Sequence, residues 1–316
     1  MTNDTPIQTK SPGERLRNLM QEGAVATPGA FNGLVARAVQ QAGFDACYVS
    51  GGAITAASGV PDIGLRGVKH FVRIVAEVAT GSQLPVVADA DTGFGEAEMV
   101  ARTVWEYAHA GAGALHIEDQ VFPKRCGHLE GKQLVPVDHF QEKIAVAAAT
   151  RDRLANEARL PGFVVCARTD AAGVEGFDAA IARASAYVEA GADMIFPEGL
   201  ASEAEFGMFA EAMRPLPGDS QHGGPFLLAN MTEFGKTPMI SMSRFAALGY
   251  DVVIFPVTTL RIAMGAIARA LATIAREGSA ASALDAMQTR AELYDLLGYT
   301  PGEEWRHPGP APRQSS

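Results

Sequence analysis

Residues 110–120 read Ala-Gly-Ala-Gly-Ala-Leu-His-Ile-Glu-Asp-Gln, and the order of features in this stretch decides the fold. Gly111 stands where an alanine-rich segment with helical spacing ends and the chain turns back. Ala114–Glu118 is a short apolar run, and acidic and amide side chains follow it directly. A buried strand that follows a helix and ends in polar groups is typical of a parallel sheet covered by helices.

The same arrangement recurs along the chain. Alanine-rich segments with helical spacing alternate with apolar runs, for example Glu98–Ala110, Phe140–Ala155, Asp178–Ala190 and Ser243–Leu248. Eight β/α units in one chain predict a (β/α)8 TIM-type barrel, and a doubly wound open sheet is the alternative. The eight predicted strands are Ala24–Pro28, Ala46–Ser50, Leu84–Ala88, Ala114–Glu118, Phe163–Arg168, Met194–Pro197, Phe226–Asn230 and Val252–Pro256.

A repeated glycine pattern favours one barrel over two domains. A glycine, at 43, 111, 191 or 249, precedes every second run, where a helix must stop and turn toward a strand. We expect a disordered arm at 1–12, the barrel at 13–278, a helical extension at 279–300 and a disordered tail at 301–316. Two helices are predicted after the last strand, at about Thr259–Arg276 and Ala281–Leu297, and the apolar stripe of the second suggests a partner subunit.

Composition excludes several classes of protein. The chain has 316 residues and a formal net charge of −10, and no basic patch of the kind that nucleic-acid binding requires is visible. Three scattered cysteines argue against a disulfide framework. The polar first residues do not resemble a signal peptide, and no uninterrupted apolar run approaches the roughly 18 residues of a membrane span. These features predict a cytoplasmic protein, and they leave room for a small anionic substrate, because a local cluster of Lys and Arg can oppose the overall charge.

Acidic residues gather where the predicted strands end. Asp89, Asp91, Glu118 and Asp62 are expected at one rim of the barrel, where unpaired carboxylates would repel one another. A cation is their natural partner, and all-oxygen ligands favour Mg2+ or Mn2+. The alternative is that one or two of them cap a helix or pair with Arg168.

The segment after the fourth run is unusually long. It extends from Asp119 to about Val137, where Asp138 and Gln141 predict a capping box at the start of the next helix. Loops of this length in a compact barrel are often active-site lids. This one contains Lys124-Arg125-Cys126-Gly127-His128, in which neighbouring cations would tune the thiol toward reactivity. Cys47 and Cys166 lie inside predicted strands and are expected to be buried.

Taken together, these segments closely resemble the isocitrate lyase/phosphoenolpyruvate mutase superfamily and, within it, the 2-methylisocitrate lyases. The resemblance runs from about Gly23 to Tyr299, and the Lys-Arg-Cys-Gly-His loop is similar to the signature of the lyase branch. The stretch between Ser50 and Pro61 departs from the usual form, with Ala53-Ile54-Thr55 and a contraction of one residue. The carriers are Tyr48-Val49-Ser50-Gly51-Gly52, Pro61-Asp62-Ile63-Gly64, Asp89-Ala90-Asp91-Thr92-Gly93-Phe94-Gly95, Ile117-Glu118-Asp119-Gln120, residues 124–128, Ala167-Arg168-Thr169-Asp170, Phe196-Pro197-Glu198 and Asn230-Met231-Thr232-Glu233-Phe234-Gly235.

The resemblance implies a Mg2+-dependent retro-Claisen cleavage of a 2-hydroxy tricarboxylate to pyruvate and succinate. Cys126 would be the proton donor and Tyr48 the base, and Lys124, Arg125 and His128 would stabilise charge. Metal binding would fall to Asp89, with Asp62, Asp91 and Glu118 acting directly or through water. It further implies a homotetramer whose last helices cross between subunits. The substrate would be bound by Ser50, Gly51, Gly52, Gly127, Arg168, Glu198, Asn230, Thr232 and Arg261.

Other functions stay open at this point. A related lyase for isocitrate, 2,3-dimethylmalate or another 2-alkylmalate is the first alternative, and an oxaloacetate hydrolase or phosphonate mutase is the second. From a different class, the chain could be an inactive barrel that binds a dicarboxylate. His116, two residues before Glu118 on the same predicted strand face, is equally consistent with packing and with a supporting role.

Overall fold

A computed structural model describes residues 10–125 and 131–310. Its eight parallel strands pair in the order β1-β8-β7-β6-β5-β4-β3-β2. A bridge between Gly29 and Tyr48, with a 2.8 Å hydrogen bond from the Ala30 N–H to the Tyr48 carbonyl, joins β1 to β2 and closes the barrel. The predicted fold is therefore confirmed. The strands are β1 (Val25–Pro28), β2 (Cys47–Val49), β3 (Val86–Asp89), β4 (Ala112–Glu118), β5 (Val164–Thr169), β6 (Met194–Pro197), β7 (Phe226–Asn230) and β8 (Val252–Phe255).

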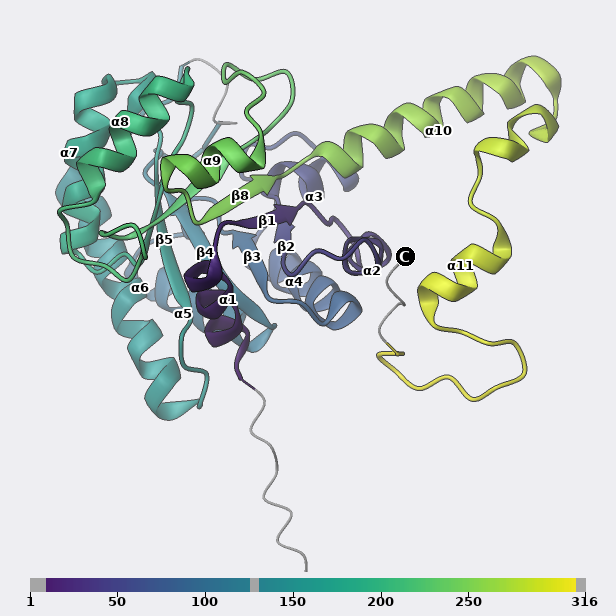
Figure 1. The fold of residues 1–316 in the computed structure, drawn as a ribbon, viewed down its shortest axis with the longest axis horizontal. Coiled ribbons are helices and arrows are strands. Elements are labelled where there is room, and N and C mark those ends of the chain that lie inside the picture. Colours follow the sequence, from purple (N-terminus) through teal and green to yellow (C-terminus); the bar gives the residue numbers. More distant parts are fainter. Residues whose placement is uncertain (1–9, 126–130, 311–316) are drawn as a thin grey trace, which may run out of the picture.

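Helices cover the outside of this barrel (Figure 1). Every predicted strand and helical segment up to residue 255 is present, with shifts of one to three residues at most ends. The helices are α1 (Pro12–Glu22), α2 (Gly33–Gln41), α3 (Gly51–Ala57), α4 (Val68–Ser82), α5 (Ala97–His109), α6 (Val137–Glu157), α7 (Phe177–Glu189), α8 (Glu203–Met213), α9 (Met242–Leu248), α10 (Thr258–Glu277) and α11 (Arg290–Leu297), with 3-10 turns η1 (Ala171–Gly173) and η2 (Ala281–Ala286).

The core has two layers. Alternate strand residues point inward and form one buried cluster that includes Val87, Cys166 and Phe226, and Leu16 and Met20 of α1 belong to it. Helix α1 thus packs on the barrel interior. The other strand residues pack outward against the helices in a second, larger cluster. Cys47 and Cys166 are both buried, as predicted.

The repeated glycine pattern has a structural cause. Each of the four glycines has a left-handed φ, between 85° at Gly43 and 105° at Gly191, which a side chain would strain. Two residues after Gly191 and Gly249 comes an aspartate that clamps the preceding strand. Asp193 Oδ2 accepts the N–H of Val165 at 2.9 Å, and Asp251 Oδ2 accepts that of Leu227 at 2.8 Å.

Two local predictions were wrong. Helix α6 begins at Val137 with no side-chain cap, because Gln141 donates to the carbonyl of Ala186 instead of closing a capping box. The second C-terminal helix is broken into η2 and α11, since Thr289 starts a new helix with its own capping box.

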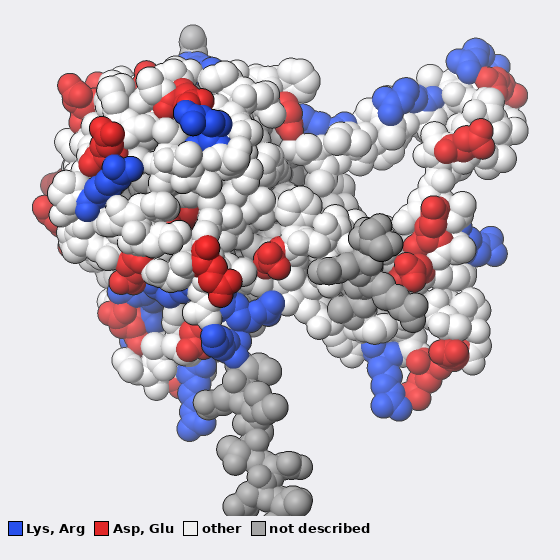
Figure 2. All heavy atoms as spheres, viewed as in Figure 1, with Lys and Arg blue, Asp and Glu red and all other residues white. Residues whose placement is uncertain are grey.

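Helix α10 forms an arm that stands clear of the barrel (Figures 1 and 2), and none of its residues is buried. Leu260, Met264, Ile267, Leu271 and Ile274 follow heptad spacing along it, and the last four are 45–61% exposed. Among residues 10–125 and 131–310, α10 is the helix that meets the length and composition of a membrane span. Arg261 and Arg269 interrupt it, so the sequence contains no continuous apolar run here.

The chain returns to the barrel after the arm. Arg37 of α2 donates to the carbonyls of Leu296 and Pro308, at 2.7 and 3.3 Å. Residues 301–310, expected to be part of a disordered tail, therefore include a contact with α2. Residues 1–9 and 311–316 of the predicted disordered ends lie outside the described residues.

Candidate active site

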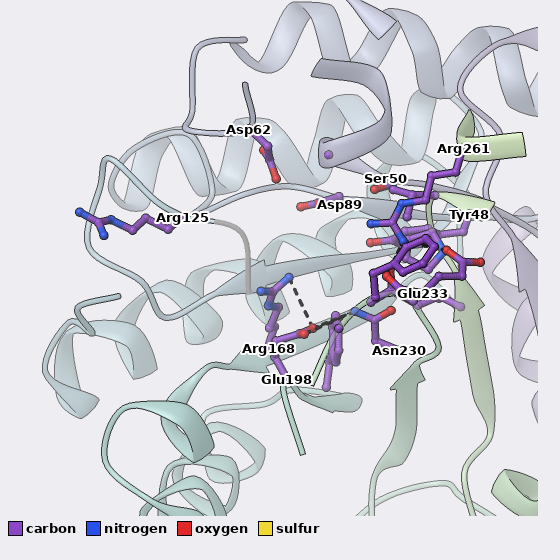
Figure 3. Close-up of a pocket in the computed structure, with 18 of the residues that line it drawn as sticks. Tyr48, Ser50, Asp62, Asp89, Arg125, Arg168, Glu198, Asn230, Glu233 and Arg261 are labelled. Carbon is purple, nitrogen blue, oxygen red and sulfur yellow. Dashed lines mark hydrogen bonds and ion pairs between the residues drawn. The ribbon is translucent and has the colours of Figure 1, made fainter. Parts of the chain in front are cut away.

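A cavity of about 280 Å3 opens at the carboxyl ends of the strands. It brings together most of the residues singled out in the sequence, from seven different loops and strand ends (Figure 3). Gly51, Asp91 and Glu118 do not line it, and Cys126, Gly127 and His128 lie outside the described residues. The predicted residues that line the cavity are Tyr48, Ser50, Gly52, Asp62, Asp89, Lys124, Arg125, Arg168, Glu198, Asn230, Thr232 and Arg261.

The end of β2 is fitted closely to Asp89. Ser50 caps α3 by accepting the N–H of Ala53, and the N–H of Gly51 donates to Asp89 Oδ2 at 2.9 Å. A Cβ at position 51 would lie 2.7 Å from that same oxygen, so only glycine fits there. The helix start and the carboxylate are therefore locked together, with Ser50 and Gly52 left facing the cavity.

Tyr48 and His116 form a buried pair beside them. The phenol oxygen lies 2.7 Å from His116 Nε2, and His116 Nδ1 lies 3.9 Å from Asp89 Oδ1. Burial lowers the pKa of His116 to about 4, so the imidazole is neutral. Burial and the Asp89 charge raise the pKa of Tyr48 well above its usual value, so the phenol keeps its proton. Of the two roles considered for His116, the contact with Tyr48 favours the supporting one.

The carboxylates meet a cation supplied by the chain. Lys124 Nζ lies 2.7 Å from both Asp62 Oδ1 and Asp91 Oδ1. Burial raises the pKa of Asp91 to about 7, although Lys124 opposes this. Burial likewise raises the pKa of Glu118 well above its usual value.

These side chains fit a hard divalent cation by the nature of their donors. All are oxygens, and Asp91 Oδ2 and both carboxylate oxygens of Glu118 are buried and accept no hydrogen bond from the residues that the structure describes. Within the part of the chain that the structure describes, no three acidic, histidine or cysteine side chains are yet gathered around one point. Asp91 also adopts a left-handed φ of 46°, which is uncommon for a residue other than glycine and occurs at functional sites.

Arg168 forms a second polar cluster across the cavity. Its Nη1 lies 3.4 Å from Glu118 and 3.8 Å from Glu198, and its guanidinium stacks over Phe196 at 5.1 Å. Asn230 donates to Glu198 Oε2 at 3.1 Å. The close-up shows Arg168, Glu198 and Asn230 on one side of the cavity. Arg125 points away from them (Figure 3).

Arg261 approaches from the first turn of α10. Its Nη1 donates to Glu233 Oε2 at 3.0 Å and to the Glu233 carbonyl, and it lies over the ring of Phe234 at 5.3 Å. The wall of the cavity therefore includes the root of the exposed arm.

Sequence reasoning missed several lining residues. For most of them, a neighbouring residue in the same motif was predicted instead. Pro256 and Val257 could have been predicted from position alone, because they directly follow β8. Phe234 has a left-handed φ of 61° and is 95% exposed, which no local pattern indicates. The missed residues are Phe196, Glu233, Phe234, Gly235, Ile254, Pro256 and Val257.

A cavity lined by carboxylates and by Arg168 and Arg261, at the carboxyl ends of the strands of a (β/α)8 barrel, is typical of an enzyme that acts on a small polyanionic substrate. The family model of phosphoenolpyruvate phosphomutase matches residues 16–275. A probable 2-methylisocitrate lyase of Corynebacterium glutamicum is 51% identical over 86% of this chain and 84% of its own. The 2-methylisocitrate lyase of Aeropyrum pernix is 47% identical over 91% and 88%. The chain belongs to the 2-methylisocitrate lyases of the phosphoenolpyruvate mutase/isocitrate lyase superfamily.

Solved structures of related enzymes have the same fold. An oxaloacetate acetylhydrolase has a TM-score of 0.83 at 33% identity, covering 91% of this chain and 93% of the other. A 2,3-dimethylmalate lyase has 0.81 at 35% identity, with 92% of each chain covered. A phosphonopyruvate hydrolase in complex with oxalate and Mg++ has 0.77 at 31% identity, covering 91% and 95%.

Proposed function

We propose that this chain is a Mg2+-dependent carbon–carbon lyase that cleaves 2-methylisocitrate to pyruvate and succinate. The observation that carries the proposal is the distribution of acidic and basic side chains along the wall of the cavity. A 2-hydroxy acid end would face Ser50 and Asp89, and the remaining carboxylates would face Arg168 and Arg261. The identity of 51% with a probable 2-methylisocitrate lyase supports the same substrate.

Asp89, Asp91, Asp62 and Glu118 would hold the Mg2+ ion (Mn2+ being possible), directly or through water. Bound there, the ion would polarise the substrate hydroxyl and stabilise the negative charge that develops on its oxygen as the proton leaves. If Asp62 and Asp91 held the ion directly, Lys124, whose Nζ lies 2.7 Å from both carboxylates, would be displaced. Lys124 would then be available to the substrate.

Tyr48 would take the proton of the substrate hydroxyl. Because its own pKa is raised, it can do so only while passing its phenol proton to His116 Nε2, which lies 2.7 Å away. The imidazolium formed would be stabilised by Asp89. The electron pair of the hydroxyl oxygen then forms the carbonyl of pyruvate, and the C–C bond breaks.

The other fragment leaves as a succinate carbanion, which must take up one proton. Cys126 would donate it, with Arg125 and His128 stabilising the thiolate that results, and Gly127 would contribute to substrate binding. The carboxylates of this fragment would be bound by Arg168 and Arg261, and Glu198, Asn230 and Thr232 would complete the pocket around it.

A second copy of the chain would cover the arm, and we expect a homotetramer in the cytoplasm. Heptad spacing on α10 suits packing against another helix. Within the described part of the chain, none of the residues of α10 is buried. Exchange of α10 and α11 between subunits would bury the apolar side chains of this stripe.

A substrate panel tests the function. Purified enzyme with Mg2+ is given 2-methylisocitrate, isocitrate, 2,3-dimethylmalate and oxaloacetate, each with and without EDTA, and pyruvate, succinate, glyoxylate and oxalate are measured. We expect equal amounts of pyruvate and succinate from 2-methylisocitrate, with kcat/KM roughly 10–100-fold above isocitrate, since one methyl group is worth about that much. Faster cleavage of 2,3-dimethylmalate would assign the first alternative, and no cleavage at all would favour an inactive binding barrel.

A further inference from the structure

Arg168 is held from behind by a buried aspartate. Its Nε and Nη2 donate to Asp170 Oδ2 and Oδ1, at 3.0 and 3.2 Å. The remaining nitrogen, Nη1, faces Glu118 and Glu198. Two bonds along one edge fix the plane of a guanidinium, so Asp170 determines which edge of Arg168 is offered to the cavity.

Asp170 in turn has a second cation. Lys132 Nζ lies 2.7 Å from Asp170 Oδ1, and the two side chains are only 5% and 0% exposed. Burial alone would raise the pKa of Asp170, but Arg168 and Lys132 outweigh it and lower the pKa to about 2. The carboxylate is therefore charged and shared between the lysine and the arginine.

The backbone on both sides of this contact is fixed. Next to Lys132, the carbonyl of Gln133 accepts the N–H of Val121 at 2.8 Å. The N–H of Asp170 donates to the buried Asp119 at 3.0 Å. The lysine thus approaches from the segment that leads into α6, and the aspartate from the end of β5.

We propose that Lys132 positions Arg168, through Asp170, for the carboxylate of the substrate. Glu118 and Glu198 compete with Asp170 for the same guanidinium. When Lys132 holds Oδ1, the aspartate cannot rotate, and Arg168 stays on the Asp170 side. Without Lys132 the guanidinium is free to swing toward the two glutamates, which would neutralise it. The effect falls on substrate binding and much less on the chemical step.

This inference rests on the proposed function only in taking Arg168 as the residue that binds a carboxylate. The test measures binding of oxalate and of succinate by calorimetry in the presence of Mg2+, together with kcat and KM. It compares Lys132→Met, Lys132→Arg and, as a matched control, Lys69→Met on the exposed surface of α4. Asp170→Asn is the second variant, in case Lys132→Met does not fold.

For Lys132→Met we expect roughly tenfold weaker binding of the probe that contacts Arg168, and a matching rise in KM with kcat within about twofold, as for loss of one charged hydrogen bond. Lys132→Arg and Lys69→Met should stay within about twofold of the unmodified enzyme. Asp170→Asn should lose at least as much affinity as Lys132→Met.

Unchanged binding in Lys132→Met, a fall in kcat at constant KM, or no rescue by arginine overturns the proposal. So does failure of the unmodified enzyme to bind either probe. If it binds the probes but does not cleave 2-methylisocitrate, the proposed function fails, and calorimetry still decides the role of Lys132.

Discussion

The phenol of Tyr48 and the imidazole of His116 share a 2.7 Å hydrogen bond in a fully buried setting. If they act as one proton relay, Tyr48→Phe should lower kcat by about 10²–10⁴-fold. Adding His116→Asn to that variant should cost little more, because residues that act as a unit are not additive. Steady-state kinetics of the two single variants and the double variant decides this. Tyr250→Phe, which removes a buried hydroxyl that donates to the Phe206 carbonyl, is the control, and additive losses would contradict a relay.

Lys124 should stabilise the metal-free enzyme. Lys124→Met leaves Asp62 and Asp91 without their 2.7 Å partner, and breaking a buried ion pair costs about 3–5 kcal/mol. At pH 8 in EDTA we therefore expect a lower Tm than for the unmodified enzyme, with part of the loss recovered on adding Mg2+. Below pH 7 the loss should shrink, because the pKa of Asp91 is raised to about 7 and its carboxyl becomes neutral. An unchanged Tm in EDTA would show that Lys124 is not the counter-charge.

Chelation should abolish turnover, and Mg2+ should restore it. Asp89→Asn is expected to prevent this recovery, since a neutral amide is a much poorer ligand than a carboxylate. Activity that survives EDTA would contradict the magnesium requirement.

Cys126 should act on the chemical step alone. Cys126→Ser is expected to lower kcat by about 10²–10⁴-fold while KM changes little, because a hydroxyl is a far weaker acid than a thiol. Cys47→Ala, at a buried site in β2, is the matched control and should keep its activity per folded molecule. Full activity in Cys126→Ser would revive the phosphonate mutase and oxaloacetate hydrolase alternatives.

The arm should control assembly. Leu271→Asp places a charge on the heptad stripe of α10, where Leu271 is 61% exposed in the isolated chain. We expect light scattering to show dissociation of the tetramer, and KM to rise because Arg261 at the root of the arm lines the cavity. Ala272→Asp, on the adjacent face, should leave the assembly intact. A fully active monomer would contradict both the assembly and its link to the site.

Asp251 should make stability depend on pH. Burial raises its pKa to about 6, so its ionisation opposes folding. This penalty is absent below the unfolded pKa near 4, grows as the pH rises to about 6 and is then constant, at roughly 3 kcal/mol. Asp251→Asn keeps an acceptor for the Leu227 N–H and should gain stability relative to the unmodified enzyme over that range. Denaturant unfolding at pH 4.5 and 7.5 tests this, and a pH-independent difference would refute it.

The barrel was predictable because its signals are local. Each strand is a short apolar run, and glycines at 43, 111, 191 and 249 mark the turns through a left-handed φ that can be expected from residue type. The break between η2 and α11 was not predicted, since the apolar spacing continues across it. The only local signal is Thr289, which caps the start of α11.

The site was predictable in membership and not in pairing. Strand ends gave Asp89, Asp91 and Arg168, but which charge neutralises which depends on contacts between distant segments. Lys124 lies between two acids, although the sequence assigned it to the thiol. His116 likewise gains its role from Tyr48, 68 residues away.

In the second half of the barrel, two aspartate side chains each bond to the strand before their own. Asp193 ties β6 to β5, and Asp251 ties β8 to β7, so each pair carries its own fastening. This arrangement gives the chain natural seams for dissection. Two fragments separated between β6 and β7 would each retain a complete clamp, whereas a cut between β5 and β6 would divide one.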